Sequence, residues 1–499
     1  AALALARAPA LGSGAVYDGE ARFESARLYG GLRGFGYYFA DLLIGAPSPQ
    51  RASLIVDTGS SLVGFPCAGC DHCGRRHLDP PFNVSRSSTA RWAPCGKHCD
   101  SCVRDRCSYT VGYSEGSAIN GSLFEDLVAL GDSHWRRAPV RTRLGCHDSE
   151  NHLFYRQRAS GIMGLAPQGR GGPLRLSHSL SMNRAWNVEP DFLRGFFADQ
   201  AHIGAHMFSL CLAQWGGALT VGGYNASYHS PRHAGDGGRP GVQWIDMFTA
   251  EGYWIQPDGV WIGDYPVASD SSQLGSALVD SGTTYTYFPA AVYSTLVSDL
   301  VMHCSLHEGC GADREGDRCW RLHNSTEPTL FPPMKLRFRK GPVVEWPAHG
   351  YLQQQNALVA PNLWCLVFDQ DDDPSDGVRT TLGMSWMLDH DVIFDIKNHR
   401  LGVVPANCPP HFEQPDLQSH RLAVGRRRGR HAATSGPHAG AGHGSESGDR
   451  DRRRAASGRP RGRRKCAGGE AGCNEAPPQG LAEVPAGRRS ARPPPRPSW

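Results

Sequence analysis

The sequence LIVDTGSS at residues 54–61 largely decides the fold, because it recurs as ALVDSGTT at residues 277–284. Each copy places apolar residues before an Asp, and a hydroxyl residue, a Gly and two further hydroxyl residues after it. An apolar element that contains Gly follows each copy, GIMGLA at 161–166 and TLGMSW at 381–386. A duplication over this distance predicts two homologous lobes that each contribute one Asp to a shared site.

Asp57 and Asp280 are predicted to be the catalytic pair. A lone Asp-Thr-Gly is more often an Asx turn that ends a strand, but two copies in matching contexts favour a shared function. Two carboxylates side by side cannot both ionise cheaply, so one pKa rises and the pair shares a proton. Such a pair can take a proton from water while giving one to a carbonyl oxygen, which is general acid–base hydrolysis of an amide.

The flanking residues of both loops are expected to support the carboxylates. The two glycines let backbone N–H groups approach, and the hydroxyl residues after them can bond the outer carboxylate oxygens. Thr58 and Ser281 are placed to bond across the two loops. The supporting residues predicted in this way are Thr58, Gly59, Ser60, Ser281, Gly282 and Thr283.

Between residues 36 and 410 the sequence is typical of a β protein. Short runs rich in apolar and aromatic residues, such as YYFADLLIG at 37–45 and DVIFDI at 391–396, alternate with clusters of Gly, Pro, Asn and Asp. The best helical pattern is AAVYSTLVSDLVMHC at 290–304, which begins after Pro289 and spaces apolar residues by three and four. The predicted fold class is all-β, with two lobes related by pseudo-twofold symmetry.

The composition divides the chain at about residue 410. The 499 residues carry 52 Lys and Arg against 48 Asp and Glu, and residues 411–499 hold 18 of the basic and 8 of the acidic side chains. This segment has too little apolar surface to order itself, so a disordered tail rich in Arg, Gly and Pro is predicted. An arm for nucleic acid is disfavoured, since no aromatic residues are interleaved to stack on bases. An anionic membrane is disfavoured for lack of an amphipathic period.

Several features favour the secretory pathway, either the endoplasmic reticulum or secretion. Residues 1–35 begin with small and apolar residues, and we interpret them as a signal or propeptide remnant. Fourteen cysteines lie between Cys67 and Cys408, which favours an oxidising compartment. No run of about 18 apolar residues occurs, so no membrane anchor is visible in the sequence. Four N-glycosylation sequons lie at Asn83, Asn120, Asn225 and Asn324.

These features together resemble the pepsin-fold aspartic proteases of the A1 type, whose dyad is the standard example of a shared proton. The resemblance covers roughly residues 36–408 and includes the ending VIFDIKNHRLGVV at 392–404. A finer resemblance is to the branch of plasmepsin V-like and plant nepenthesin-like proteases. It rests on PCAGCDHCG at 66–74 with the cysteines that follow, FSLCL at 208–212, LTVGGYN at 219–225 and ANCP at 406–409.

The resemblance implies an aspartic endopeptidase that acts on peptides or proteins as a monomer, without a cofactor. YSEGSAINGS at 113–122 resembles the β-hairpin flap of the family, which makes Tyr113 the flap tyrosine and Gly116 the glycine of its turn. Plasmepsin V-like enzymes cut export signals after the Leu of Arg-x-Leu, and a flap Glu and a Gln grip the substrate Arg. Glu115 matches that Glu, and Gln157 is the candidate for the Gln. Processing of secretory or exported proteins at Arg-x-Leu-like sites is therefore expected.

The sequence departs from the family pattern at three places. Gly64 stands where pepsins carry the Trp that partners the flap tyrosine. Ser114 replaces the flap cysteine of the plasmepsin V-like branch. Where that branch carries a C-terminal membrane helix, this sequence carries the Arg/Gly/Pro-rich tail.

The cysteine-rich segment 67–107 admits two interpretations. Zinc sites usually show paired CxxC units separated by a dozen or more residues, and here the spacings run together, so no metal is assigned. The resemblance implies instead a disulfide-knotted insert, a plausible long-range bridge from Cys211 to Cys408, and two more bridges among the four remaining cysteines of the second lobe. Connectivity otherwise stays open. The cysteines expected in disulfides are Cys67, Cys70, Cys73, Cys95, Cys99, Cys102, Cys107, Cys146, Cys211, Cys304, Cys310, Cys319, Cys365 and Cys408.

The predicted organisation is an N-terminal segment 1–35, a first lobe 36–215 that contains the insert 67–107, a second lobe 216–410 and a tail 411–499. The alternative from another class is a non-catalytic pepsin-fold protein that binds peptides without cutting them. Loss of one catalytic Asp is the usual mark of such proteins, and both are present here.

Overall fold

The structure is a computed structural model. It describes residues 22–96, 99, 101–131, 139–167, 191–201, 203–230, 241–249, 252–306, 308–324, 327–355, 360–371 and 379–411. Most of the predicted N-terminal segment, and the predicted tail after residue 411, lie outside these residues. The described residues are built mainly from strands, which confirms the all-β, two-lobed fold class.

The first ten strands surround the first Asp loop. The last six residues of β3, up to Asp57, are all buried, as a continuous apolar run predicts for a strand covered on both faces. These strands are β1 (Glu24–Gly31), β2 (Tyr37–Ile44), β3 (Gln50–Asp57), β4 (Val63–Pro66), β5 (Arg91–Trp92), β6 (Ser101–Val103), β7 (Arg106–Gly112), β8 (Ala118–Leu130), β9 (Val140–Glu150) and β10 (Gly161–Gly164).

The remaining strands surround the second Asp loop or link the lobes. They are β11 (Met207–Leu212), β12 (Gly217–Val221), β13 (Gln243–Thr249), β14 (Tyr253–Ile255), β15 (Pro257–Ile262), β16 (Tyr265–Ala268), β17 (Ser276–Val279), β18 (Thr286–Pro289), β19 (Ala312–Glu315), β20 (Cys319–Leu322), β21 (Met334–Phe338), β22 (Val343–Trp346), β23 (Leu352–Gln354), β24 (Leu363–Leu366), β25 (Phe368–Asp371), β26 (Arg379–Leu382), β27 (His390–Asp395) and β28 (Arg400–Pro405).

The longest described helix is α4 (Ala290–Leu306), which confirms the helix predicted at 290–304. It buries Val292, Leu296, Leu300 and Cys304, one residue per turn on a single face. The other helices are α1 (His152–Arg156), α2 (Asp191–Ala198), α3 (Ser271–Leu274), α5 (Ala348–Tyr351) and α6 (Met384–Met387). No helix in the described ranges has the length and apolar character needed to cross a membrane.

The duplication in the sequence is also a duplication in the structure. β10 runs parallel to β3 and pairs Gly164 with Asp57. β26 runs parallel to β17 and pairs Leu382 with Val279. Each Asp-bearing strand therefore lies beside the Gly-containing apolar element that follows it in the sequence.

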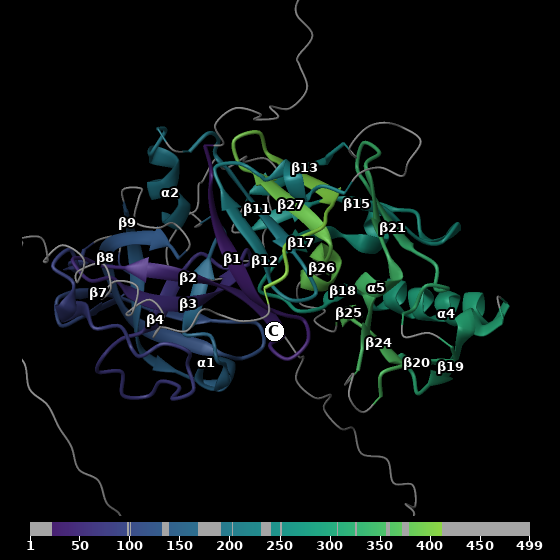
Figure 1. Cartoon of the computed structure of the whole chain (residues 1–499), viewed down its shortest axis with the longest axis horizontal. Helices are drawn as coiled ribbons and strands as arrows, with labels where there is room; N and C mark the ends of the chain where they lie inside the picture. The colour runs from purple at the N-terminus through teal and green to yellow at the C-terminus, as the bar shows by residue number, and fades with distance from the viewer. Residues whose placement is uncertain are drawn as a thin grey trace, which may run out of the picture. The chain divides into compact units, whose positions relative to one another are not determined.

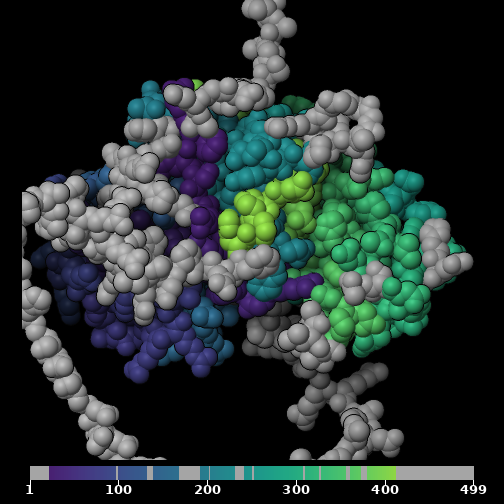
Figure 2. Space-filling model, in the orientation of Figure 1, coloured from purple at the N-terminus to yellow at the C-terminus, as the bar shows by residue number. Residues whose placement is uncertain are grey.

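Both lobes contribute to one antiparallel sheet with the strand order β1–β12–β11–β27–β28–β13. Figure 1 shows these strands between first-lobe strands such as β2 and β8 and the second-lobe strands β15 and β21. In Figure 2 the yellow-green residues near 400 lie between purple N-terminal residues and green residues of the second lobe. The predicted lobe boundary at 215 and 216 falls between two paired strands of this sheet, β11 and β12.

The apolar core continues from the first lobe through this sheet into the second. The Phe208 ring on β11 stacks on the Phe394 ring on β27, with centroids 4.5 Å apart. Tyr253 packs edge-on against Phe394 at 4.7 Å, and its hydroxyl donates to the Leu165 carbonyl at 2.7 Å, directly after β10. The core therefore connects the shared sheet to the strand that supports the first Asp loop.

The cysteines from Cys67 to Cys408 are all paired. Cys211 bridges to Cys408, the long-range pair expected from the sequence, and it ties β11 to the residues after β28. The second lobe holds Cys304–Cys310 and Cys319–Cys365. The first-lobe bridges, which the sequence left open, are Cys67–Cys146, Cys70–Cys73, Cys95–Cys102 and Cys99–Cys107.

Candidate active site

Asp57 and Asp280 occupy equivalent ends of equivalent strands. Asp57 is the last residue of β3, and Asp280 directly follows β17. The Leu165 N–H donates to the Asp57 carbonyl at 2.7 Å, and the Asp280 N–H donates to the Leu382 carbonyl at 3.0 Å. The apolar elements that contain Gly thus fix the backbone of both Asp residues.

The two carboxylates are neighbours, as the glycines of the loops reveal. A Cβ atom on Gly59 would lie 2.6 Å from Asp280 Oδ1. A Cβ atom on Gly282 would lie 2.3 Å from Asp57 Oδ1 and 3.2 Å from Asp280 Oδ1. The close approach of the opposite carboxylate therefore explains why each loop carries Gly at this position.

Two donors within each loop orient its carboxylate. The Gly59 N–H donates to Asp57 Oδ1 at 2.8 Å, and the Ser60 hydroxyl donates to Asp57 Oδ2. In the second loop, Gly282 N–H and the Thr283 hydroxyl make the corresponding bonds at 2.8 Å and 2.5 Å. These bonds hold both carboxylates in fixed orientations.

Thr58 and Ser281 join the two loops by a symmetric set of four hydrogen bonds. The Thr58 N–H donates to Ser281 Oγ at 3.1 Å, and the Ser281 N–H donates to Thr58 Oγ1 at 2.9 Å. The Thr58 hydroxyl donates to the Val279 carbonyl at 2.9 Å, and the Ser281 hydroxyl to the Val56 carbonyl at 2.8 Å. Both side chains are buried, so the bonds fix one loop relative to the other.

The environment of Asp57 favours a proton on this pair. Burial raises the pKa of Asp57 well above its usual range, and the Asp280 carboxylate adds to the increase. The bonds from Ser60 and Gly59 act in the opposite direction without cancelling it. An arrangement in which one carboxyl keeps its proton beside an ionised partner can donate and accept protons at the same point.

A β-hairpin formed by β7 and β8 carries the predicted flap residues. Its turn runs from Tyr113 to Ser117, with the Tyr113 N–H donating to the Ser117 carbonyl at 2.8 Å and the Gly116 N–H donating to the Tyr113 carbonyl at 3.0 Å. Gly116 has a φ of +92°, in the left-handed region that favours glycine. The sequence therefore supplies the residue that this turn requires.

The Tyr113 side chain lies near the first Asp loop. Burial raises the pKa of its phenol well above the usual range, and the Asp57 carboxylate adds to that increase. Its ring packs on Phe154 of α1 with centroids 4.9 Å apart. The Ser60 side chain acts in the opposite direction on this pKa, which places the phenol next to the first Asp loop.

His147 occupies the space beside Gly64, where pepsins carry a Trp. A Cβ atom on Gly64 would lie 2.6 Å from His147 Nε2. The His147 ring also packs edge-on against Phe154, at 6.3 Å between centroids. The flap tyrosine and His147 thus contact the same phenylalanine ring, and a bulky residue at position 64 has no room.

The two predicted substrate residues lie on the flap turn and at the end of α1, which are joined by a hydrogen bond. Glu115 is half-buried in the flap turn, and burial raises its pKa. Gln157 is the residue at the C-terminal cap of α1 and is 8% exposed. Neither Glu115 Oε1 nor either amide atom of Gln157 has a hydrogen-bond partner within the described residues. The Leu153 N–H of α1 donates to Ser117 Oγ of the flap turn at 3.2 Å.

His147 and Phe154 were missed by the sequence analysis. An isolated His and an isolated Phe carry no local signal, and their positions depend on β9 and α1 packing beneath the flap. The absence of a Trp at Gly64 was the one available indication, because it implies that another side chain fills that space.

In the parts of the chain with described side chains, no group of three or more His, Cys, Asp or Glu is placed to hold a metal ion. The cysteines that a zinc cluster in the insert would need are held in disulfides.

Two family models match the chain in the order of its lobes. Residues 38–186 match the model described as xylanase inhibitor N-terminal, and residues 252–404 match xylanase inhibitor C-terminal. The first match contains Asp57 and the flap, and the second contains Asp280. The two matched segments therefore correspond to the two halves of the duplication.

Individual proteins similar to the chain are proteases by name. Aspartic protease 5 of Toxoplasma gondii is 31% identical over 441 residues, which cover 78% of this chain and 38% of that protein. Plasmepsin V of Plasmodium falciparum is 24% identical, over 77% of this chain and 72% of that protein. Aspartic proteinase nepenthesin-1 of Nepenthes gracilis is 26% identical, over 65% and 70% respectively. The chain thus spans well under half the length of the Toxoplasma relative.

Proposed function

Because the chain belongs to the pepsin-like aspartic proteases, a family of aspartic-type endopeptidases, we propose that it hydrolyses peptide or protein substrates at Asp57 and Asp280. The observation that carries this proposal is the position of the two carboxylates, both of which a single Cβ atom on Gly282 would contact. Two carboxylates this close favour one shared proton. One member of the pair then acts as a base and the other as an acid.

In the proposed reaction a water molecule attacks the scissile carbonyl carbon. The ionised carboxylate takes a proton from the water as the new C–O bond forms, and the protonated carboxyl gives its proton to the carbonyl oxygen. The first step exchanges the roles of the two carboxyls. The carboxyl that is now protonated gives its proton to the amide nitrogen, the carboxylate that is now ionised takes a proton from one diol hydroxyl, and the C–N bond breaks as the C=O bond re-forms, which restores the starting pair. The loop donors at Gly59 and Gly282 support this role, because they hold each carboxylate in orientation without any rearrangement.

We further propose that the hairpin 113–117 closes over bound substrate and excludes water. The proximity of the Tyr113 phenol to Asp57 supports this role. The Tyr113 ring packs on Phe154 of α1, and this contact anchors the hairpin beside the candidate site.

Glu115 and Gln157 are proposed to bind an Arg side chain of the substrate. Glu115 offers a half-buried carboxylate with one unpartnered oxygen, and Gln157 offers a buried amide whose two polar atoms lack partners among the described residues. A planar guanidinium can give two parallel N–H bonds to the two oxygens of a carboxylate, a geometry that an ammonium does not offer. Cleavage after the Leu of Arg-x-Leu-like sites is therefore the proposed preference.

The compartment proposed is the secretory pathway, in the endoplasmic reticulum or after secretion. Seven disulfides support an oxidising environment. We also propose that the enzyme acts as a monomer and that the functional lobes are 36–215 and 216–410, with 67–107 as an insert.

A non-catalytic peptide binder is the second candidate, because the matching family models are described as xylanase inhibitor. A binder needs no second carboxylate and no donors that orient it. The presence of both loops with matching donor sets favours the enzyme. Peptide binding at acidic pH without cleavage would support the binder instead.

The test is cleavage of matched Arg-x-Leu, Lys-x-Leu and Ala-x-Leu peptides by the full-length chain. A hydrogen bond to a charged group contributes about 1.5–3 kcal/mol. The Arg peptide is therefore expected to be preferred over the Lys and Ala peptides by about 10- to 100-fold in kcat/KM. Glu115→Gln should lose most of that preference, whereas Glu345→Gln, which removes an exposed carboxylate on β22, should keep it. Equal cleavage of the three peptides would leave a general endopeptidase, and binding without cleavage would reject the enzyme.

A further inference from the structure

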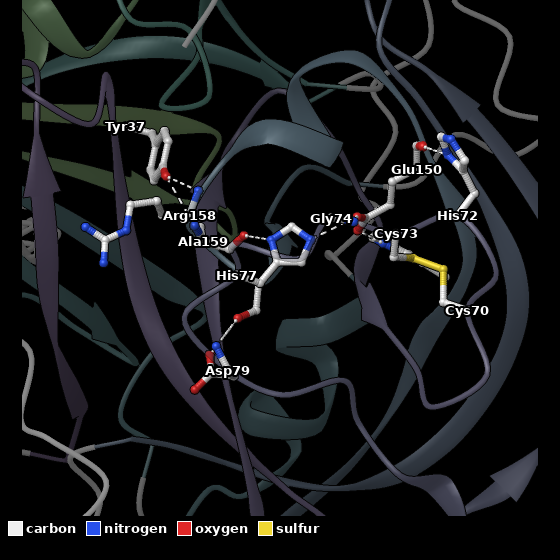
Figure 3. A network of polar contacts seen from close by, with 12 residues as sticks. Tyr37, Cys70, His72, Cys73, Gly74, His77, Asp79, Glu150, Arg158 and Ala159 are labelled. Atoms are coloured by element: carbon white, nitrogen blue, oxygen red, sulfur yellow. Dashed lines mark hydrogen bonds and ion pairs between the residues drawn. A yellow bond between two sulfur atoms is a disulfide. The ribbon is translucent and has the colours of Figure 1, made fainter. Parts of the chain in front are cut away.

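A buried polar network links the cysteine-rich insert to the region beside the candidate site (Figure 3). At its centre Glu150, the last residue of β9, accepts hydrogen bonds from His147 Nδ1 at 2.9 Å, His77 Nε2 at 2.9 Å and the Gly74 N–H at 3.0 Å. Burial alone would raise the pKa of Glu150, but the bonds from His147 and His77 outweigh it and hold the pKa to about 2. Glu150 is therefore ionised in the folded protein at neutral and mildly acidic pH.

His77 lies between two groups that can only accept hydrogen bonds. Its Nδ1 is 2.9 Å from the Ala159 carbonyl oxygen, and its Nε2 is 2.9 Å from the ionised Glu150 carboxylate. Both ring nitrogens of His77 are therefore engaged, one by a backbone carbonyl of segment 158–160 and the other by the Glu150 carboxylate. The His77 side chain is only 4% exposed, and the Glu150 side chain that it contacts is fully buried.

The two residues after His77 bind the same segment as His77 does. The Leu78 N–H donates to the Arg158 carbonyl at 2.7 Å. The Asp79 N–H donates to Ser160 Oγ at 3.0 Å, and the Ser160 hydroxyl donates back to Asp79 Oδ2 at 2.7 Å. Segment 158–160 leads directly into β10, the strand that supports the first Asp loop.

Gln157 stands immediately before this segment. From the opposite side, the Tyr37 hydroxyl of β2 accepts the N–H groups of Arg158 and Ala159, each at 3.1 Å. Figure 3 shows Tyr37 and His77 on either side of Ala159. The backbone that follows Gln157 is therefore held from two directions, by β2 and by the insert.

We propose that His77 is a positioning residue for substrate binding, because its bonds to Glu150 and Ala159 fix the backbone that carries Gln157. The inference rests on the proposed function, in which the Gln157 amide contacts the substrate Arg. A displacement of about 1 Å in such a contact costs up to about 100-fold. Loosening this segment weakens substrate binding, while the pairing of β10 with β3 and the hydrogen bonds between the two Asp loops keep the Asp pair in place. The cysteine-rich insert is then part of the substrate site.

The test uses full-length variants that each retain one of the two bonds of His77. The amide nitrogen of Asn matches Nδ1 and keeps the bond to Ala159, whereas that of Gln matches Nε2 and keeps the bond to Glu150. Both His77→Asn and His77→Gln are expected to raise KM for an Arg-x-Leu peptide by about 10-fold and to change kcat by no more than about twofold. Tyr37→Phe removes the hydroxyl that accepts the N–H groups of Arg158 and Ala159, and it is also expected to raise KM. This variant tests the importance of segment 158–160 if the His77 variants fail to fold.

His72→Asn is the matched control. His72 is an exposed histidine of the same insert. Its ring Nδ1 lies 2.9 Å from the backbone carbonyl oxygen of Glu150, a bond that the Asn amide can keep, and the ring packs on Tyr155. The KM of the His72→Asn variant should equal that of the wild type.

Two outcomes separate this inference from the proposed function. An unchanged KM in both His77 variants and in Tyr37→Phe overturns the inference. A wild type that treats Arg-x-Leu and Ala-x-Leu peptides alike rejects the Arg role of Glu115 and Gln157. In that case the positioning role survives only if the His77 variants raise KM for both peptides, and it fails otherwise.

Discussion

Replacing Glu150 by Gln should remove a defined part of the stability at acidic pH. The pKa of Glu150 falls from the ordinary 4.5 to about 2 in the folded chain. A depressed carboxyl pKa stabilises the fold fully above the ordinary value, and this contribution is lost as the pH falls through the folded value. This lowering of the Glu150 pKa corresponds to about 3 kcal/mol of unfolding free energy, lost between about pH 5.5 and pH 2.

The assay is urea unfolding followed by Trp fluorescence at several pH values from 5.5 to 2.5. Wild type, Glu150→Gln and the exposed control Glu345→Gln should all carry Asp57→Asn, so that self-digestion does not enter. Glu150→Gln is expected to be less stable at pH 5.5 and to converge on the wild type as the pH falls, while Glu345→Gln runs parallel to the wild type. A constant difference between wild type and Glu150→Gln across this range would refute an ionised, buried Glu150.

Three further outcomes are expected. Gly282→Ala places a methyl group 2.3 Å from Asp57 Oδ1, so it should lower kcat by about 100-fold or more while the circular dichroism spectrum stays unchanged. Near-normal turnover would contradict the close approach of the Asp57 carboxylate to Gly282. Burial and Asp280 raise the pKa of Asp57, so the protonated carboxyl of the pair persists to higher pH than an ordinary Asp does. The value of kcat/KM should therefore fall only as the pH rises through that raised pKa. A fall of kcat/KM near the ordinary carboxyl pKa would argue against a shared proton. Mass analysis under non-reducing conditions should find the cysteines from Cys67 to Cys408 in disulfides, and free thiols with stoichiometric zinc would overturn the disulfide assignment.

The parts of the fold that the sequence predicts are those encoded within short segments. The Asp loops could be placed because the apolar run, the Asp and the hydroxyl residues are contiguous and occur twice. The helix Ala290–Leu306 could be placed because its apolar spacing and the Pro before it are local signals. Each of these features depends on residues that lie close together in the sequence.

The first-lobe disulfides needed the structure because they depend on distant strands. Cys67 and Cys146 are 79 residues apart, and they meet because β4 and β9 run parallel with Phe65 opposite Cys146. Nothing in the spacing of the eight first-lobe cysteines distinguishes this pairing from its alternatives.

The network around Glu150 could not be predicted for the same reason. The sequence CHDSENH at 146–152 is almost entirely polar, yet it holds the buried carboxylate of Glu150. Its partners His77 and Gly74 come from the insert, more than 70 residues earlier. A buried charge is tolerated only where such partners converge, and that convergence is a property of the folded chain.

Peptide hydrolysis by full-length Asp57→Asn and Asp280→Asn is the most direct test of the proposed catalytic pair. Either change removes the shared proton while preserving side-chain size, so each variant should lose about 100- to 10,000-fold in kcat and keep the wild-type melting temperature and circular dichroism spectrum to a close approximation. A folded single variant that retains near-normal turnover on the same peptide would contradict the assignment of Asp57 and Asp280 as the pair that activates water.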